Sequence, residues 1–107
     1  MNKEQIKLLN KMKILIRKGK RRFKERKDRS YKDALAKLYL TEEQAWKHIL
    51  SLNSNMYFVD SKPYYYKENN TLIFKKIINN YKVYIKLKID LINGEEVVCW
   101  SFHKDGE

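Results

Sequence analysis

This chain is poor in the residues that build disulfide-linked or nucleotide-cradling structures. Its 107 residues include three glycines, one proline and one cysteine. A single cysteine cannot form a disulfide within the chain, which suits a reducing compartment, and we therefore expect a cytoplasmic protein. Three glycines do not supply a P-loop or a Gly-rich dinucleotide fingerprint. Two histidines and one cysteine at scattered positions match no zinc-binding pattern.

Long apolar runs and paired carboxylates are also missing. No apolar run approaches the roughly 20 residues that a membrane helix needs. The N-terminal segment carries charges within its apolar pattern, so we do not expect a signal peptide. No two carboxylates share a predicted strand face, which disfavours two-metal cleavage of phosphodiesters. We therefore expect no membrane span, no metal site and no cofactor.

Basic residues are abundant instead. Lysine and arginine number 24 against 13 acidic residues, which gives a formal net charge of +11. Hydrophobic residues make up 43% of the chain, as in a folded domain, so we expect one domain over residues 1–107. A domain this basic is typical of proteins that meet a polyanion: RNA, DNA, an anionic membrane or an acidic protein. The charge could also serve solubility alone.

Helical periodicity of apolar residues appears in three segments, at residues 3–18, 31–39 and 42–52. The first segment has a lysine-rich face and ends before Gly19; a basic amphipathic helix packs on a core or binds a membrane surface or partner groove. Ser30 can cap the second helix. Thr41 and Gln44 form a capping box for the third. We interpret His48 in that helix as a packing or capping residue rather than a catalytic one.

The C-terminal part, residues 81–103, has the alternation of a β-hairpin around Asn93-Gly94. A two-residue loop at this dipeptide fixes which residues oppose each other on the two strands. The dry face would then pair Phe102 with Ile85, Trp100 with Leu87, and Val98 with Ile89. The polar face would pair His103 with Tyr84, Ser101 with Lys86, and Cys99 with Lys88.

Further strands are predicted before this hairpin. Residues 71–78 form a strand that turns at Asn79-Asn80, which sets Lys75 opposite Tyr84. Residues 56–60 read as a short strand. The tyrosines that follow could stack on bases or form an aromatic edge strand: Tyr64, Tyr65 and Tyr66. The predicted fold class is α+β, an antiparallel β-sheet centred on residues 81–90 with the helices packed on one face.

The densest basic run lies at residues 20–29. It is either a solvated loop or charged edge strand, or a rim that binds phosphates, for which arginine has a suitable planar fork. The predicted RNA-binding residues in and beyond this run are Arg21, Arg22, Lys24, Arg26, Lys62 and Lys88.

The polar face of the hairpin contains groups that suit cleavage of RNA without a metal. This reaction needs a base, an acid and fixed cations near the phosphate. His103 exchanges protons near neutral pH, and Tyr84 can donate or orient a proton. Lys86 and Lys75 can hold the phosphate. The alternative interpretation is a tyrosine and two lysines on the wet side of a sheet.

The chain also resembles a known family. The segment Tyr84-Ile-Lys-Leu-Lys-Ile89, followed by Ser101-Phe-His103, is similar to the MqsR family of bacterial toxins. The order of the upstream features is similar as well, over about residues 6–103: Gly19 after a lysine-rich helix, Phe23, Leu38-Tyr-Leu-Thr41, Ala45 and Ile49-Leu-Ser-Leu52. The resemblance implies a RelE-like α+β fold, an mRNA endoribonuclease without metal or cofactor, and a cognate antitoxin that neutralises it.

The resemblance carries over to single positions only in part. The strand tyrosine of the family matches Tyr84, its next lysine matches Lys86, and its basic residue after Ser-Phe is His103 here. A further family lysine has no clean match: Val59 is nearest to it, and Lys62 is the closest lysine. A family glutamine corresponds roughly to Phe74 or Lys75.

The polar face of the hairpin and the resemblance together predict a small endoribonuclease, and the resemblance implies that it is a toxin whose partners are its RNA substrate and an antitoxin. Two alternatives stay open. One is a non-catalytic nucleic-acid-binding protein, such as a small repressor or phage inhibitor, that uses the same basic face. The other is a protein that binds an acidic partner and no nucleic acid.

Overall fold

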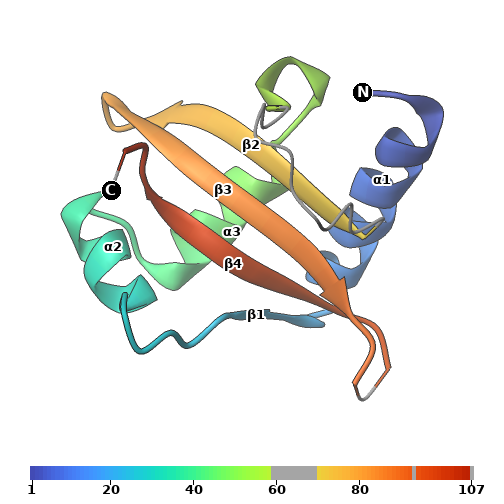
Figure 1. The fold of residues 1–107 in the computed structure, drawn as a ribbon, viewed down its shortest axis with the longest axis horizontal. Helices are drawn as coiled ribbons and strands as arrows, with labels where there is room; N and C mark the ends of the chain where they lie inside the picture. The colour runs from blue at the N-terminus through green and yellow to red at the C-terminus, as the bar shows by residue number, and fades with distance from the viewer. Residues whose placement is uncertain (59–69, 93, 107) are drawn as a thin grey trace.

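A computed structural model describes residues 1–58, 70–92 and 94–106 of the chain. These residues form one four-stranded sheet, in the order β1-β4-β3-β2, with the α-helices behind it in Figure 1. The predicted α+β fold class is confirmed. The elements in chain order are α1 (Lys3–Arg17), β1 (Arg21–Phe23), α2 (Tyr31–Lys37), α3 (Glu42–Leu50), the 3₁₀ helix η1 (Ser54–Met56), β2 (Thr71–Ile78), β3 (Tyr81–Asp90) and β4 (Glu96–Lys104).

The helices begin at side chains that satisfy their first backbone N–H groups. Thr41 and Gln44 form the predicted capping box of α3, and Ser30 caps α2 as predicted. Asn2 and Gln5 form a second capping box at α1, which the sequence reading did not single out. Each helix ends one or two residues before its predicted limit, because the last turn is a looser cap.

The carboxyl ends of α2 and α3 are bound by side chains from other elements. The Nδ2 atom of Asn79, in the β2–β3 turn, donates to the Leu38 carbonyl at 2.8 Å. The Nζ atom of Lys13 in α1 donates to the Leu52 carbonyl, just beyond α3, at 2.6 Å. Helix ends leave carbonyl groups without partners, so these bonds attach the helices to the sheet and to each other.

The hairpin of β2 and β3 has the predicted register. Lys75 lies opposite Tyr84, and Phe74 lies opposite Ile85. The turn residues Asn79 and Asn80 have φ angles of 50° and 70°. A type I′ turn needs positive φ at both central positions, and asparagine tolerates it better than most residues.

The hairpin of β3 and β4 has the predicted register only near its open end. His103 lies opposite Tyr84 and Ser101 opposite Lys86, as predicted, but Cys99 lies opposite Leu87. Trp100 is therefore the extra residue of a β-bulge, and its predicted pairing with Leu87 on the dry face is wrong. The remaining pairs of the hairpin also differ from the prediction: in the structure, Val97 lies opposite Ile89 and Val98 lies opposite Lys88.

The space available on the helix side gives a physical reason for this bulge. The Phe23 ring lies beside Cys99 in the register of β1 and β4 and packs on Trp46, with centroids 4.8 Å apart. Phe102 also contacts Phe23 edge-on at 6.5 Å. With these rings in place, the small thiol of Cys99 fits the inner position opposite Leu87, and a larger indole goes to the other face.

The connection between β3 and β4 is longer than the predicted two-residue loop. Pairing ends at Asp90 and Glu96, so residues 91–95 connect the strands. The Oδ1 atom of Asp90 accepts a hydrogen bond from the Ile92 backbone N–H at 3.2 Å, which stabilises the start of this loop. Asn93 lies outside the described residues, so the turn type at Asn93-Gly94 stays a prediction.

The sheet is mixed, which corrects the prediction of an antiparallel one. β1 pairs with β4 in parallel, with Arg22 beside Val98. Within the described residues, α2, α3, η1, β2 and β3 lie between β1 and β4 in the sequence, so no hairpin turn forces β1 and β4 to run in opposite directions. The edge-strand interpretation of the basic run is correct for residues 21–23.

The predicted strand at residues 56–60 is mostly wrong within the described residues. Met56 ends the 3₁₀ helix η1. Tyr57 makes a single bridge to Phe74, and the Phe58 N–H donates to the Ile73 carbonyl at 2.9 Å. Lys62 and the three adjacent tyrosines lie outside the described residues.

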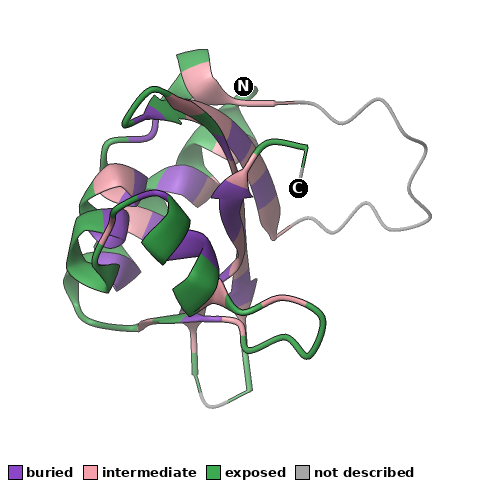
Figure 2. Ribbon diagram, turned by 90° about the vertical axis from the view of Figure 1, so that its left-hand side faces the viewer, coloured by how far each residue is buried: buried purple, intermediate pink, exposed green. Residues whose placement is uncertain are grey.

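The sheet has two different faces. Figure 2 shows it nearly edge-on, with buried residues between it and the helices. Met12, Ile49, Phe74 and Ile85 are fully buried on this inner side. We call the other side the outer face; no described helix covers it, and its residues include Lys75, Tyr84, Lys86, Lys88, Trp100, Ser101 and His103. Among the described residues, no helix is long and apolar enough to cross a membrane.

Candidate functional site

Tyr84 and His103 form an aromatic pair at the centre of the outer face. Their ring centroids are 5.4 Å apart and their planes differ by 21°, so the rings are stacked. The pair follows from the register, because β3 and β4 place these residues directly opposite each other. The sequence predicted that these two residues lie opposite each other, and their contact brings a phenol and an imidazole together.

The His103 side chain is buried and its ring contacts a backbone carbonyl. It is 7% exposed, and its Nδ1 atom lies 2.8 Å from the backbone carbonyl oxygen of Lys104. A carbonyl oxygen only accepts, so this contact places the ring proton on Nδ1. The Nε2 atom of the neutral ring is then the one that can take up a proton.

Lys75 and Lys86 flank the aromatic pair on the outer face. Lys75 lies opposite Tyr84 in β2, where its Nζ atom makes an ion pair with Asp105 at 3.1 Å. The same Nζ atom lies 3.9 Å from the centroid of the Phe58 ring. Lys86 is two residues from Tyr84 in β3 and therefore points to the same face. All four predicted catalytic residues thus gather on one side of the sheet.

Trp100 and three lysines form a second cluster, next to the first. The Nζ atoms of Lys24, Lys88 and Lys86 lie 5.0, 5.6 and 5.9 Å from the Trp100 ring centroid. These distances are within the range of cation–π attraction. We call these four residues the Trp100 cluster. Sequence reasoning chose Lys24, Lys86 and Lys88 but placed Trp100 in the core, because strict alternation gives no sign of a bulge.

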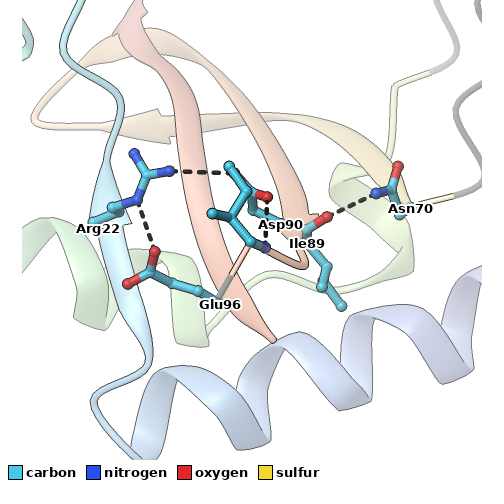
Figure 3. Close-up of polar contacts among 6 residues, drawn as sticks. Arg22, Asn70, Ile89, Asp90 and Glu96 are labelled. Atoms are coloured by element: carbon cyan, nitrogen blue, oxygen red, sulfur yellow. Dashed lines mark hydrogen bonds and ion pairs between the residues drawn. The ribbon is translucent and has the colours of Figure 1, made fainter. Parts of the chain in front are cut away.

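The predicted arginines are paired with carboxylates instead. Figure 3 shows Arg22 between Glu96 and Asp90, with contacts of 2.7 and 3.3 Å. Nearby, the Asn70 side chain donates to the Ile89 carbonyl at 2.7 Å, which attaches the start of β2 to β3. Arg22 therefore serves to join β1 to the loop end of the β3–β4 hairpin.

Arg21 and Arg26 are engaged in the same way. Arg21 contacts Glu43 at 3.0 Å and lies over the Trp46 ring, on the helix side of the sheet. Arg26 pairs with Asp28 at 3.3 Å. Each of the three predicted phosphate-binding arginines thus has an acidic partner within the described residues. Lys62, the sixth predicted RNA-binding residue, lies outside the described residues.

A third polar cluster joins α3 to β2 on the helix side. The Lys76 ammonium lies 2.9 Å from His48 Nδ1 and 2.5 Å from Ser51 Oγ. Burial, and secondarily the positive charge of Lys76, lower the pKa of His48. A neutral imidazole accepts from the ammonium, so His48 is a packing and capping residue here, in agreement with its sequence interpretation.

Two hollows in the described surface lie away from the aromatic pair. One is lined by Gly19, Arg22 and Asp90 among others, and another by Arg21, Tyr31 and Trp46 among others. Neither of these two hollows is lined by Tyr84 or His103. Within residues 1–58, 70–92 and 94–106, no group of three or more His, Cys, Asp or Glu side chains is placed to hold a metal ion.

Comparison of the chain with models of protein families, with curated proteins and with solved structures finds no match.

Proposed function

We propose that this protein is an endoribonuclease that cleaves RNA with its own side chains and needs no cofactor. The observation that carries this proposal is the Tyr84–His103 stack on the outer face, with Lys75 and Lys86 beside it. A base, an acid and fixed cations on one accessible face are the groups that transesterification at a phosphate requires.

The proposed mechanism assigns a role to each group. His103 Nε2 takes or returns a proton, and the Nδ1 contact to the Lys104 carbonyl keeps the ring in the required tautomer. The Tyr84 hydroxyl exchanges the second proton or orients the phosphate. Lys86 stabilises the charge that develops on the phosphate oxygens, and Lys75 supports it from the neighbouring strand.

RNA cleavage in EDTA tests this proposal. The variants Tyr84→Phe and His103→Ala should each lose about 10²- to 10⁴-fold in cleavage rate, the usual contribution of a positioned acid or base. The matched controls are Tyr39→Phe, at a tyrosine that is 77% exposed, and His48→Asn, on the helix side. Rates within a few-fold of wild type in both site variants, with thermal midpoints unchanged, would contradict the assignment.

A second candidate function is RNA binding without catalysis. Two observations favour it: His103 is only 7% exposed, and Lys75 already has Asp105 as a partner. Under this alternative, the site variants lose RNA affinity, while the wild-type protein leaves the RNA intact.

The resemblance to MqsR toxins motivates two further parts of the proposal. The α+β arrangement would belong to the RelE-like group, and an acidic antitoxin would neutralise the protein in the cytoplasm. The net charge of +11 supports an acidic partner of this kind. Expression of the chain should slow bacterial growth, and co-expression of the antitoxin should restore it.

A further inference from the structure

The β-bulge at Trp100 creates a feature of the outer face that the catalytic proposal does not use. At a bulge, two residues oppose one, so Trp100 and Ser101 both face outward between the inward positions of Cys99 and Phe102. The indole is consequently placed on the outer face, where it is only partly exposed and lies among the ammonium groups of the Trp100 cluster.

The lysines of this cluster differ from the arginines of β1 in their charge balance. Lys24 and Lys86 form no ion pair within the part of the chain that the structure describes, whereas Arg22 contacts two carboxylates. The ammonium groups of Lys24 and Lys86, which both lie near the Trp100 ring, repel each other. An anion that binds there removes this repulsion, so the cluster favours an anionic ligand more than the charge-paired end of the same face does.

We propose that the Trp100 cluster is a binding site for an unpaired nucleotide of single-stranded RNA. The base stacks on the Trp100 indole, and the phosphates on either side of it contact Lys24, Lys86 and Lys88. This inference rests on the proposed RNA substrate, but not on catalysis. Stacking between an aromatic side chain and a base, next to basic groups that bind the backbone, is the usual chemistry of single-strand recognition.

Two sides of the indole are supplied with cations by different strands. Lys86 and Lys88 come from β3, while Lys24 follows β1, where its backbone N–H donates to the Cys99 carbonyl at 2.9 Å. A nucleotide on Trp100 would therefore have ammonium groups on both sides for its flanking phosphates. The long lysine side chains can turn from the ring toward the phosphates when a base occupies it.

The position of the cluster connects it to the catalytic proposal. Lys86 belongs to both groups of residues, and it is two residues from Tyr84, or about 7 Å along the strand. A base on Trp100 therefore sets the position of the neighbouring phosphate, which can reach Lys86 and the Tyr84–His103 pair. A duplex would not use this site, because its bases are stacked on each other.

Binding of an uncleavable single-stranded 2′-O-methyl RNA tests the proposal. Replacement Trp100→Leu should weaken binding about 5- to 150-fold, as loss of one stacked base does, and Trp100→Phe should retain most of the affinity. Tyr39→Leu, which removes an exposed ring from α2's end, is the control. Circular dichroism and thermal midpoints show whether each variant folds. If Trp100→Leu does not fold, the proposal is tested by RNA binding of Trp100→Phe and by binding of an RNA with an abasic position.

The abasic probe separates stacking from charge. A single abasic position is moved along the oligonucleotide. When it replaces the base that stacks on Trp100, it should weaken binding to the wild type and, to a similar extent, to Trp100→Phe. It should have little effect on binding to Trp100→Leu. The triple variant Lys24→Gln, Lys86→Gln, Lys88→Gln should lower the slope of log K against log salt by about 2, since each phosphate contact contributes about 0.7. The triple control Lys7→Gln, Lys18→Gln, Lys47→Gln changes the same charge at exposed positions in helices or at a helix end.

The outcomes distinguish this inference from the function on which it rests. Wild-type cleavage of RNA together with unchanged affinity of Trp100→Leu and insensitivity to abasic positions would overturn the stacking site and leave the nuclease intact. Equal salt slopes for the two triple variants would overturn the phosphate contacts. Binding of an acidic peptide, but of no RNA, would overturn both the site and the proposed substrate.

Discussion

Lys75 and Asp105 form an ion pair across the candidate site, with Nζ and Oδ2 3.1 Å apart. The two residues come from opposite sides of β3, because Lys75 lies in β2 and Asp105 follows β4. Both side chains are partly exposed, so solvent screens the pair. Asp105 thus holds Lys75 beside Tyr84 and at the same time reduces the positive charge that an RNA phosphate would meet.

Removal of this carboxylate should strengthen RNA binding. In Asp105→Asn, the Lys75 ammonium becomes available to a phosphate, and the slope of log K against log salt should increase by about 0.7. Glu4→Gln, at the exposed start of α1, removes the same charge away from the site and is the control. Equal affinity of both variants at low salt would show that Lys75 does not contact the RNA.

The pH dependence of stability should reveal the contact between His48 and Lys76. The pKa of His48 lies below its ordinary value of 6.5, chiefly because of burial and then because of Lys76. Below pH 6.5, the unfolded chain binds a proton that the folded chain still excludes, so the free energy of unfolding falls as the pH is lowered toward the folded-state pKa.

Urea unfolding of the wild type and of His48→Asn between pH 7.5 and pH 5 measures this effect. The amide oxygen of asparagine can replace Nδ1 as acceptor and does not titrate, so the variant should lose less stability on acidification. NMR titration should also show a higher His48 pKa in Lys76→Met, although burial keeps it below the ordinary value. Parallel pH profiles for wild type and His48→Asn would refute the assignment.

Two adjacent isoleucines at the end of β2 should differ sharply in their contribution to stability. Ile78 is 2% exposed on the inner side, and Ile77 is 65% exposed. Ile78→Ala should lower the free energy of unfolding by about 2–5 kcal/mol, through lost burial and a cavity. Ile77→Ala should change it by less than about 0.5 kcal/mol. Similar losses in urea unfolding would mean that the strand faces are assigned the wrong way round.

Two glycine substitutions in the β2–β3 turn should distinguish the effect of positive φ from the effect of a side-chain hydrogen bond. Asn80 has φ of 70°, so Asn80→Gly should leave stability unchanged or raise it slightly. Asn79→Gly removes the bond from Nδ2 to the Leu38 carbonyl and should cost about 0.5–1.5 kcal/mol. Thermal unfolding of both variants compares them directly, and an equal effect would show that the Asn79 bond does not stabilise the fold.

Cys99 provides a chemical test of the bulge. Complete burial raises the pKa of its thiol far above the ordinary value, and the thiol donates to the Ser101 carbonyl at 3.3 Å. Iodoacetamide should therefore react with it only on unfolding, since the thiolate is the reactive form. Rapid labelling of the native protein would instead support the bulge-free register, in which Cys99 faces outward beside Lys88.

Local sequence signals determined much of the fold. Thr41 and Ser30 marked helix starts because a cap depends on a few neighbouring residues. Asn79-Asn80 and the alternation of β2 and β3 determined their register, because a slip of one residue would bury lysines. The predicted position of His103 opposite Tyr84 is also correct, although the bulge at Trp100 is needed to restore that register after the loop.

Only the tertiary structure decided the features that depend on contacts between distant segments. The bulge places Trp100 outside and Cys99 inside because the inner space is already filled by Phe23, Phe102 and the ring of Trp46. The parallel direction of β1 likewise depends on how the chain crosses between elements, which no turn signal encodes. A run of basic residues in the sequence shows where the cations are but not what they contact. Three-dimensional packing decides that Arg22 contacts a carboxylate and that Lys24 lies over an aromatic ring.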